Sequence, residues 1–192
     1  MFQKFQNHIN ANFSFLQDKK LLLAVSGGMD SMVLVHLFQK LDLNFALAHC
    51  NFQLRGMESE GDENFVVTYA KQNDIPFFVT KFDTENYSKS HKLSTQVAAR
   101  NLRYNWFNEI LEQEKFDYIV TAHHADDVVE TFMINLSRGT GLDGLTGIPS
   151  QNGNIVRPLL PFSRTEIENY VSENKIDLLM DPAINNFRKN SV

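Results

Sequence analysis

Six residues near the start of the chain, SGGMDS at positions 26–31, combine groups that suit the binding of a phosphate. The two glycines let the backbone approach an oxyanion closely, and Ser26 and Ser31 add hydroxyl donors. The segment follows an aliphatic run and precedes a helical pattern, so free N–H groups and the helix dipole favour an anion there. Asp30 would repel a phosphate directly, which predicts a Mg²⁺ ion between the carboxylate and the phosphate.

The same segment has a plainer interpretation, which the residues alone leave open. A glycine turn can lead into a helix whose first turn holds Asp30 and Ser31 as helix-start residues. The segment is neither a Walker A loop, which ends in Gly-Lys-Ser/Thr, nor a Gly-x-Gly-x-x-Gly dinucleotide loop. A nucleotide bound here would therefore be held differently from the ligands of those two classes.

Two further pairs of charged residues have helical spacing. Arg100 and Arg103 share a helix face and suit phosphate binding, although surface salt bridges are the alternative. Asp127 and Glu130 are one helical turn apart, and two carboxylates so placed can hold Mg²⁺ or transfer protons. Asp126 points elsewhere on that helix and is expected to cap a helix or to face solvent.

Three histidines lie close to these groups in the sequence. His49 ends an apolar run, and it is a candidate for nucleotide binding or for a structural hydrogen bond to the backbone. His123 and His124 are adjacent after a predicted strand, so their side chains should project in opposite directions. We therefore do not expect this pair to chelate one metal ion.

All six positions of the opening segment match Ser-Gly-Gly-x-Asp-Ser, and in this motif the chain resembles the N-type ATP pyrophosphatases. The resemblance implies cleavage of ATP between its α- and β-phosphates and activation of a carbonyl as its adenylate. The residues of the segment that it assigns to nucleotide binding are Ser26, Gly27, Gly28, Met29, Asp30 and Ser31. It also implies Mg²⁺ binding by Asp30 and Asp127.

Later segments resemble motifs of one branch of that group, the tRNA(Ile)-lysidine synthetases. They are AHCNFQLRG from position 48, AARNLRY from 98, TAHHADDVVET from 121 with the following SRGTG, and RPLLPFSR from 157. The second histidine of the family's His-x-Asn-His-x-Leu-Arg motif is absent, and the segment 181–192 fits its motif only in part. The resemblance covers roughly positions 21–192.

The resemblance implies a specific reaction with ATP and Mg²⁺ as cofactors. ATP adenylates the C2 oxygen of the wobble cytidine of a tRNA(Ile) precursor, and the amine of free L-lysine then displaces AMP to give lysidine. The catalytic residues that it implies are Asp30, Arg100, Asp127 and Glu130. Its further nucleotide contacts are His49, Arg100, Arg103, Gly139 and Gly141. The expected partners are tRNA(Ile) with a cytidine wobble base, L-lysine and a second copy in a homodimer.

Three other functions share parts of these features. A tRNA thiolase uses the same adenylation, but it needs a persulfide-bearing cysteine or an iron–sulfur cluster, and Cys50 is the single cysteine. An amide-forming synthetase commonly draws ammonia from a glutaminase, of which the sequence shows no sign. A non-catalytic nucleotide-binding module would have little reason to keep Asp30, Asp127 and Glu130.

Apolar runs alternate with helical patterns, which predicts an α/β fold with a doubly wound, mostly parallel sheet and helices on both faces. Strands are predicted at 21–25, 44–50, 75–82 and 118–123, and helices near the N-terminus and at 31–41, 58–72, 95–114, 126–136 and 163–173. The glycine-rich stretch 137–149 is the longest predicted loop and a candidate active-site segment.

Size and composition set further limits. We expect residues 1–192 to form one catalytic domain, with the family's C-terminal tRNA-binding domains outside it. A single cysteine favours a reducing cytoplasm, and the chain has no apolar run of the roughly 18 residues that span a bilayer. The net charge of −5 disfavours a simple nucleic-acid module and suggests that much of the tRNA affinity lies elsewhere.

Overall fold

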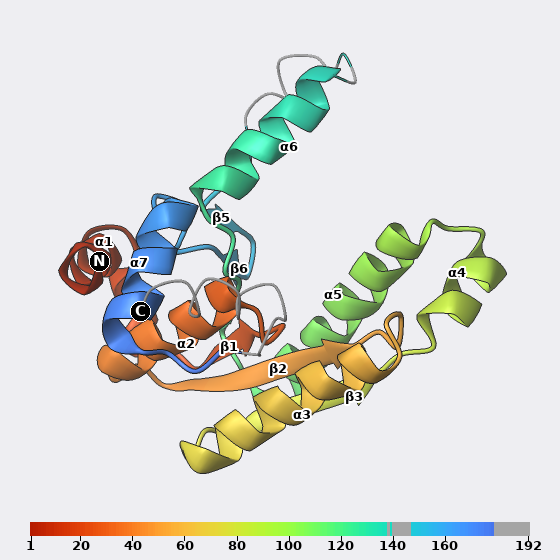
Figure 1. The fold of residues 1–192 in the computed structure, drawn as a ribbon, viewed down its shortest axis with the longest axis horizontal. Helices are drawn as coiled ribbons and strands as arrows, with labels where there is room; N and C mark the ends of the chain where they lie inside the picture. The colour runs from red at the N-terminus through yellow and green to blue at the C-terminus, as the bar shows by residue number, and fades with distance from the viewer. Residues whose placement is uncertain (138, 140–146, 179–192) are drawn as a thin grey trace, which may run out of the picture.

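One sheet of six strands, in the order β3-β2-β1-β4-β6-β5, organises the chain in the computed structural model (Figure 1). The structure describes residues 1–137, 139 and 147–178. The strands are β1 Leu21–Ala24, β2 Phe45–Asn51, β3 Phe77–Lys81, β4 Tyr118–Val120, β5 Gln151–Asn152 and β6 Ile155–Val156. Neighbouring strands are parallel except β5 and β6, which pair antiparallel. The prediction of a mostly parallel sheet is confirmed.

Helices surround this sheet. They are α1 Phe2–Asn12, α2 Met29–Lys40, α3 Met57–Gln72, α4 Thr84–His91, α5 Thr95–Glu114, α6 Ala125–Ser137 and α7 Arg164–Asn174, with a short 3-10 helix at Ser14–Leu16. The predicted helices agree with these to within about two residues at each end. The sequence did not predict α4, whose eight mostly polar residues bury Thr84 alone. It also missed the hairpin of β5 and β6, whose strands have two residues each.

Side chains of β1 alternate between two cores, as the period of a strand requires. Leu21 and Leu23 pack in the larger core, to which α1, α2, α3 and α7 contribute buried residues. Leu22 packs on the opposite face with Ala46, Ala48 and the buried side chains of α5. Helices therefore cover both faces of the sheet, which confirms the doubly wound arrangement.

The strand order reverses at β1. From there the chain runs outward through β2 to β3, then returns and places β4 on the other side of β1. In open α/β sheets such a reversal leaves a crevice beyond the carboxyl ends of the two central strands, where ligands bind. Because α2 follows β1 and α6 follows β4, the first turns of these two helices meet at that crevice.

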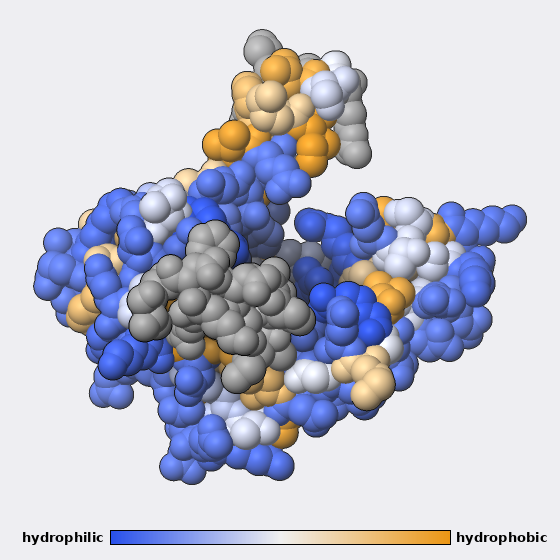
Figure 2. All heavy atoms as spheres, in the orientation of Figure 1, coloured by the Kyte–Doolittle hydropathy of each residue, from blue (hydrophilic) through white to orange (hydrophobic). Residues whose placement is uncertain are grey.

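Helix α6 projects away from the rest of the molecule beyond its first turn (Figure 1). Its exposed large apolar side chains are Val129, Phe132, Met133, Ile134 and Leu136. Figure 2 shows an apolar cluster on this projecting arm, while the surface of the arm formed by α4 and α5 is mostly hydrophilic. No helix in the described part of the chain has both the length and the apolar character needed to cross a bilayer.

Candidate active site

A cavity of about 240 Å³ lies beyond the carboxyl ends of β1, β2 and β4. Its walls come from the loop after β1, the first turns of α2 and α6, the end of β2 and one face of α5. The residues predicted as site residues that line it are Ser26, Asp30, Ser31, Arg103 and Asp127. The fold thus brings together side chains that are up to about a hundred residues apart in the sequence.

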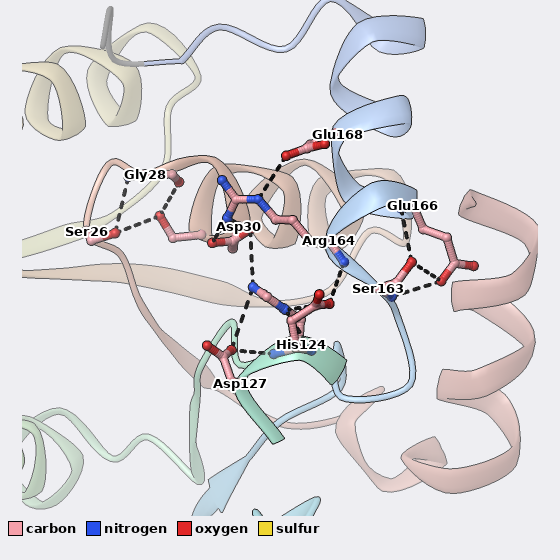
Figure 3. Close-up of polar contacts among 11 residues, drawn as sticks. Ser26, Gly28, Asp30, His124, Asp127, Ser163, Arg164, Glu166 and Glu168 are labelled. Atoms are coloured by element: carbon pink, nitrogen blue, oxygen red, sulfur yellow. Dashed lines mark hydrogen bonds and ion pairs between the residues drawn. The ribbon is translucent and has the colours of Figure 1, made fainter. Parts of the chain in front are cut away.

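The loop between β1 and α2 is held by its own serines (Figure 3). The amide of Gly28 donates to Ser26 Oγ at 3.2 Å, and Ser31 Oγ donates to the carbonyl of Gly28 at 2.8 Å. Gly27 has a φ of 87°, which favours glycine, and a Cβ at position 28 would lie only 3.2 Å from Ser26 Oγ. The backbone conformation therefore favours glycine at position 27, and a side chain at position 28 would crowd Ser26 Oγ.

Helix α2 begins at this loop and presents its positive end to the cavity. Its first backbone hydrogen bond is donated by Met32 to the carbonyl of Gly28 at 3.1 Å. The amides of Met29, Asp30 and Ser31 are the free donors that every helix start leaves. The helix-start interpretation and the phosphate-binding interpretation therefore describe the same structure, because a helix start of this kind is an anion site.

His124 lies between the two carboxylates of the site (Figure 3). Its Nε2 atom is 3.8 Å from Asp30 Oδ1 and 3.8 Å from Asp127 Oδ2, and the residue is only 6% exposed. Asp127 Oδ2 also accepts the backbone N–H of His124 at 2.8 Å, which caps the start of α6. The sequence did not predict His124 as a site residue.

Asp30 and Asp127 form a donor set that fits Mg²⁺. This ion takes one or two carboxylates from a protein and completes its shell with water and substrate phosphates. The described residues contain no group of three or more His, Cys, Asp or Glu that could hold a metal ion. The nucleotide and water would therefore have to supply the remaining ligands.

Arg164, the last residue of the RPLLPFSR segment and one to which the sequence analysis gave no role, lies beside Asp30. Arg164 Nη1 lies 3.0 Å from Asp30 Oδ1 and 2.9 Å from Asp30 Oδ2. The backbone N–H of Arg164 donates to Asp126 Oδ2 at 2.8 Å, so Asp126 caps the first turn of α7. The prediction that Asp126 caps a helix is confirmed, although it caps α7 rather than its own helix.

Of the predicted residues Arg100, Arg103 and Glu130, only Arg103 lines the cavity wall. Arg103 lines the cavity, with its guanidinium 5.1 Å from the ring centre of Phe52. Arg100 is exposed, with its guanidinium 5.0 Å from the ring centre of Tyr104. Glu130 is exposed on α6 and does not line the cavity with Asp127. The catalytic roles of Arg100 and Glu130 stay predictions.

His49 faces the opposite side of β2 from the cavity, because Ala48 and Cys50 alternate with it and line the wall. Its Nδ1–H donates to the carbonyl of Val25 at 2.8 Å, the backbone contact expected of a structural histidine. Its Nε2 is buried and has no hydrogen-bond partner among the described residues. Of the predicted loop glycines, Gly139 is exposed with a φ of 64°, and Gly141 lies outside the described residues.

Burial sets the charge state of two groups in the wall. Desolvation lowers the pKa of His123, more than the nearby carboxylate of Asp127 raises it, so the ring is neutral near pH 7. Its Nδ1 lies 2.8 Å from Thr121 Oγ1, whereas His124 contacts Asp30, Asp126 and Asp127. Burial also raises the pKa of Cys50 to about 12.

A parallel sheet with a glycine loop and two helix starts at its point of reversal defines a nucleotide-binding α/β domain. The PP-loop domain family matches residues 1–192, and the chain belongs to this family.

Relatives and solved structures agree with that assignment. The chain is 44% identical over 179 residues to the tRNA(Ile)-lysidine synthase of Bacteroides thetaiotaomicron, covering 93% of this chain and 42% of the relative. It is 43% identical to the enzyme of the same name from Chlorobaculum tepidum, covering 91% of this chain and 54% of the relative. The chain thus spans about half the length of these relatives.

Two solved structures show the same fold. The U34-tRNA thiolase NcsA from Methanococcus maripaludis, which has a [4Fe-4S] cluster, has a TM-score of 0.73 at 17% identity, over 92% of this chain and 65% of that chain. The NH3-dependent NAD synthetase from Campylobacter jejuni has a TM-score of 0.62 at 13% identity, over 92% and 74%.

Replacement of His49 should change how stability depends on pH. Because burial lowers its pKa, the unfolded chain binds a proton below about pH 6.5 that the folded chain does not bind. The titration of His49 therefore does not change the free energy of unfolding at higher pH, and it lowers that free energy as the pH falls. Urea denaturation of His49→Asn, which keeps a donor for Val25, should show a smaller loss of unfolding free energy between about pH 7 and 5. The exposed His91→Asn should keep the wild-type slope, and identical slopes in all three proteins would contradict this account.

Proposed function

We propose that residues 1–192 are the catalytic domain of an enzyme that ligates L-lysine to C2 of the wobble cytidine of a tRNA(Ile) precursor, with ATP as the activating substrate. The observation that carries the proposal is the cavity where the SGGMDS loop meets Asp127, in a chain 44% identical to a tRNA(Ile)-lysidine synthase. Hydrogen-bond donors for a polyphosphate thus line the same cavity as a carboxylate, as adenylation followed by attack of an amine requires.

The first step is adenylation of the cytosine C2 oxygen, with pyrophosphate as the leaving group. The free amides at the start of α2 and the Ser26 and Ser31 hydroxyls are the donors that stabilise its developing charge. A Mg²⁺ ion held by Asp30 and Asp127 would neutralise negative charge on the phosphates. Arg103 at the cavity wall adds a fixed positive charge from α5.

The second step needs a neutral amine. Free lysine has a side-chain pKa of about 10.4, so only a small fraction is neutral near pH 7. We assign to Asp127 the orientation of the ammonium and the acceptance of its proton; in support, the His124 amide engages Oδ2 and leaves Oδ1 for a substrate. The cytosine must also leave its stack to enter the cavity, which costs a few kcal/mol.

The variant Asp127→Asn separates the two steps. Its amide oxygen can still accept the His124 N–H and keep the start of α6, but it cannot accept a proton from lysine. We expect ATP–pyrophosphate exchange in the presence of tRNA(Ile) to persist at a reduced rate, because Asp30 remains as a metal ligand, while incorporation of radiolabelled lysine falls by about 10²-fold or more. Lysine incorporation at the wild-type rate would exclude Asp127 as the proton acceptor.

A thiolase that uses the same adenylation is less well supported. Sulfur transfer through a protein cysteine needs a thiolate, and burial raises the pKa of Cys50 to about 12. The chain has a single cysteine, so it cannot by itself ligate a cluster of the kind named for the thiolase NcsA.

Replacement of the cysteine tests this distinction. Cys50→Ser keeps the size of the side chain in the cavity wall and removes the sulfur. Because a lysine amine needs no protein thiol, we expect lysine incorporation to stay within about twofold of wild type, since no transition-state contact is lost. A loss of activity with retained ATP–pyrophosphate exchange would favour sulfur chemistry instead.

The proposal also includes a cellular location, the source of tRNA affinity and an oligomeric state. A cytoplasmic location agrees with a single cysteine and with a tRNA substrate. Much of the tRNA affinity is assigned to parts of the relatives that lie outside residues 1–192, because the chain is acidic with a net charge of −5. A homodimer stays a prediction.

A further inference from the structure

One guanidinium nitrogen of Arg164 contacts both oxygens of the Asp30 carboxylate, at 3.0 and 2.9 Å (Figure 3). A fork-to-fork arginine pair would instead use two nitrogens, one for each oxygen. The Nη1 atom therefore takes the position of a single cation bound symmetrically by the carboxylate. A divalent cation on Asp30 would use one or both of the same two oxygens.

The backbone that carries this arginine is fixed independently of any ligand. Asp126 accepts the Arg164 N–H at 2.8 Å, and Ser163 and Glu166 form a reciprocal capping box at the start of α7. Lys4 of α1 pairs with Glu166 at 2.7 Å. Further along α7, the buried Tyr170 contacts His36 of α2 at 3.0 Å. These contacts anchor the backbone at Arg164 to α6, α1 and α2.

The guanidinium itself has a second carboxylate within reach. Arg164 Nε donates to Glu168 Oε1 at 3.2 Å, one turn further along α7. The side chains of Arg164 and Asp30 are 42% and 27% exposed, so water screens their attraction. Breaking the Arg164–Asp30 ion pair therefore costs little free energy, and Arg164 keeps Glu168 as a partner when the pair is broken.

We propose that Arg164 is a positioning residue of the nucleotide site and the resident counter-cation of Asp30. Before a nucleotide binds, the guanidinium holds the carboxylate, and it releases the carboxylate when a metal-bound triphosphate enters. The inference rests on the proposed function, in which Asp30 binds the metal that accompanies ATP.

The Asp30–Arg164 pair affects nucleotide binding in opposite directions without metal and with metal. Without metal, the positive charge of Arg164 offsets the negative charge of Asp30 and so reduces the repulsion between Asp30 and a triphosphate. With metal, the Asp30–Arg164 pair has to be broken before Asp30 can coordinate, so the pair opposes binding. Loss of the arginine should therefore weaken metal-free nucleotide binding and strengthen metal-supported binding.

The test is calorimetric titration of α,β-methylene-ATP, which resists cleavage at the reactive bond, into wild type and Arg164→Gln. We expect the dissociation constant of the variant to rise about two- to fivefold in EDTA and to fall by a similar factor in excess Mg²⁺, as the loss of a partly exposed ion pair predicts. Arg164→Lys, which keeps a cation, should lie close to wild type in both conditions. A general structural defect would instead weaken binding in both.

Two further variants complete the experiment. Lys4→Gln removes another ion pair of α7 without touching Asp30, and its two dissociation constants should equal those of wild type. Asp30→Asn should strongly reduce the difference between Mg²⁺ and EDTA, although Asp127 remains. If Arg164→Gln weakens or leaves unchanged the Mg²⁺-supported binding while Asp30→Asn behaves as expected, the role of Arg164 is wrong and that of Asp30 stands. If Asp30→Asn keeps the full Mg²⁺ dependence, the metal assignment of the proposed function fails, and the role of Arg164 fails with it.

Discussion

The start of helix α2 is the feature on which the site depends. The reversal of strand order at β1 leaves the carboxyl ends of β1 and β4 open, and α2 begins there with unpaired amides and the positive end of its dipole. Gly27 adopts the positive φ that this turn from strand to helix needs, and a side chain at position 28 would crowd Ser26 Oγ. Every other group at the site is arranged around this positive helix end.

The two carboxylates of the site oppose the same anion that the positive helix end attracts. Asp30 in the first turn of α2 is stabilised by the helix dipole, and Asp127 in the first turn of α6 is stabilised in the same way. The same two carboxylates oppose an anionic triphosphate unless a cation stands between them. Arg164 supplies a cation to Asp30, and the buried ring of His124 separates the two acids. The exchange of one cation for another would then accompany nucleotide binding.

Much of the architecture follows from local patterns in the sequence. Buried strands read as aliphatic runs, long helices carry clear apolar spacing, and the Ser-Gly-Gly-x-Asp-Ser loop stands between the two. Helix α4 escaped prediction because it packs with a single buried residue, and the hairpin of β5 and β6 because its strands are too short to show alternation.

The site was predicted less completely than the fold, for physical reasons. Arg164 and Asp30 are 134 residues apart, and only the packing of α7 near α2 brings them together. The helical spacing of Asp127 and Glu130 gives them a common face, but α6 leaves the body of the molecule after its first turn, and only Asp127 reaches the cavity. His49 was a candidate from its neighbours in the motif, while the alternation of β2 directs it away from the cavity.

A crystal structure of the chain with α,β-methylene-ATP and Mg²⁺ tests the central claim most directly. The account predicts that the β- and γ-phosphates lie against the amides of residues 27–31, with the adenosine in the cavity beside β2 and α5. A nucleotide bound elsewhere, with the start of α2 free of phosphate, would contradict it.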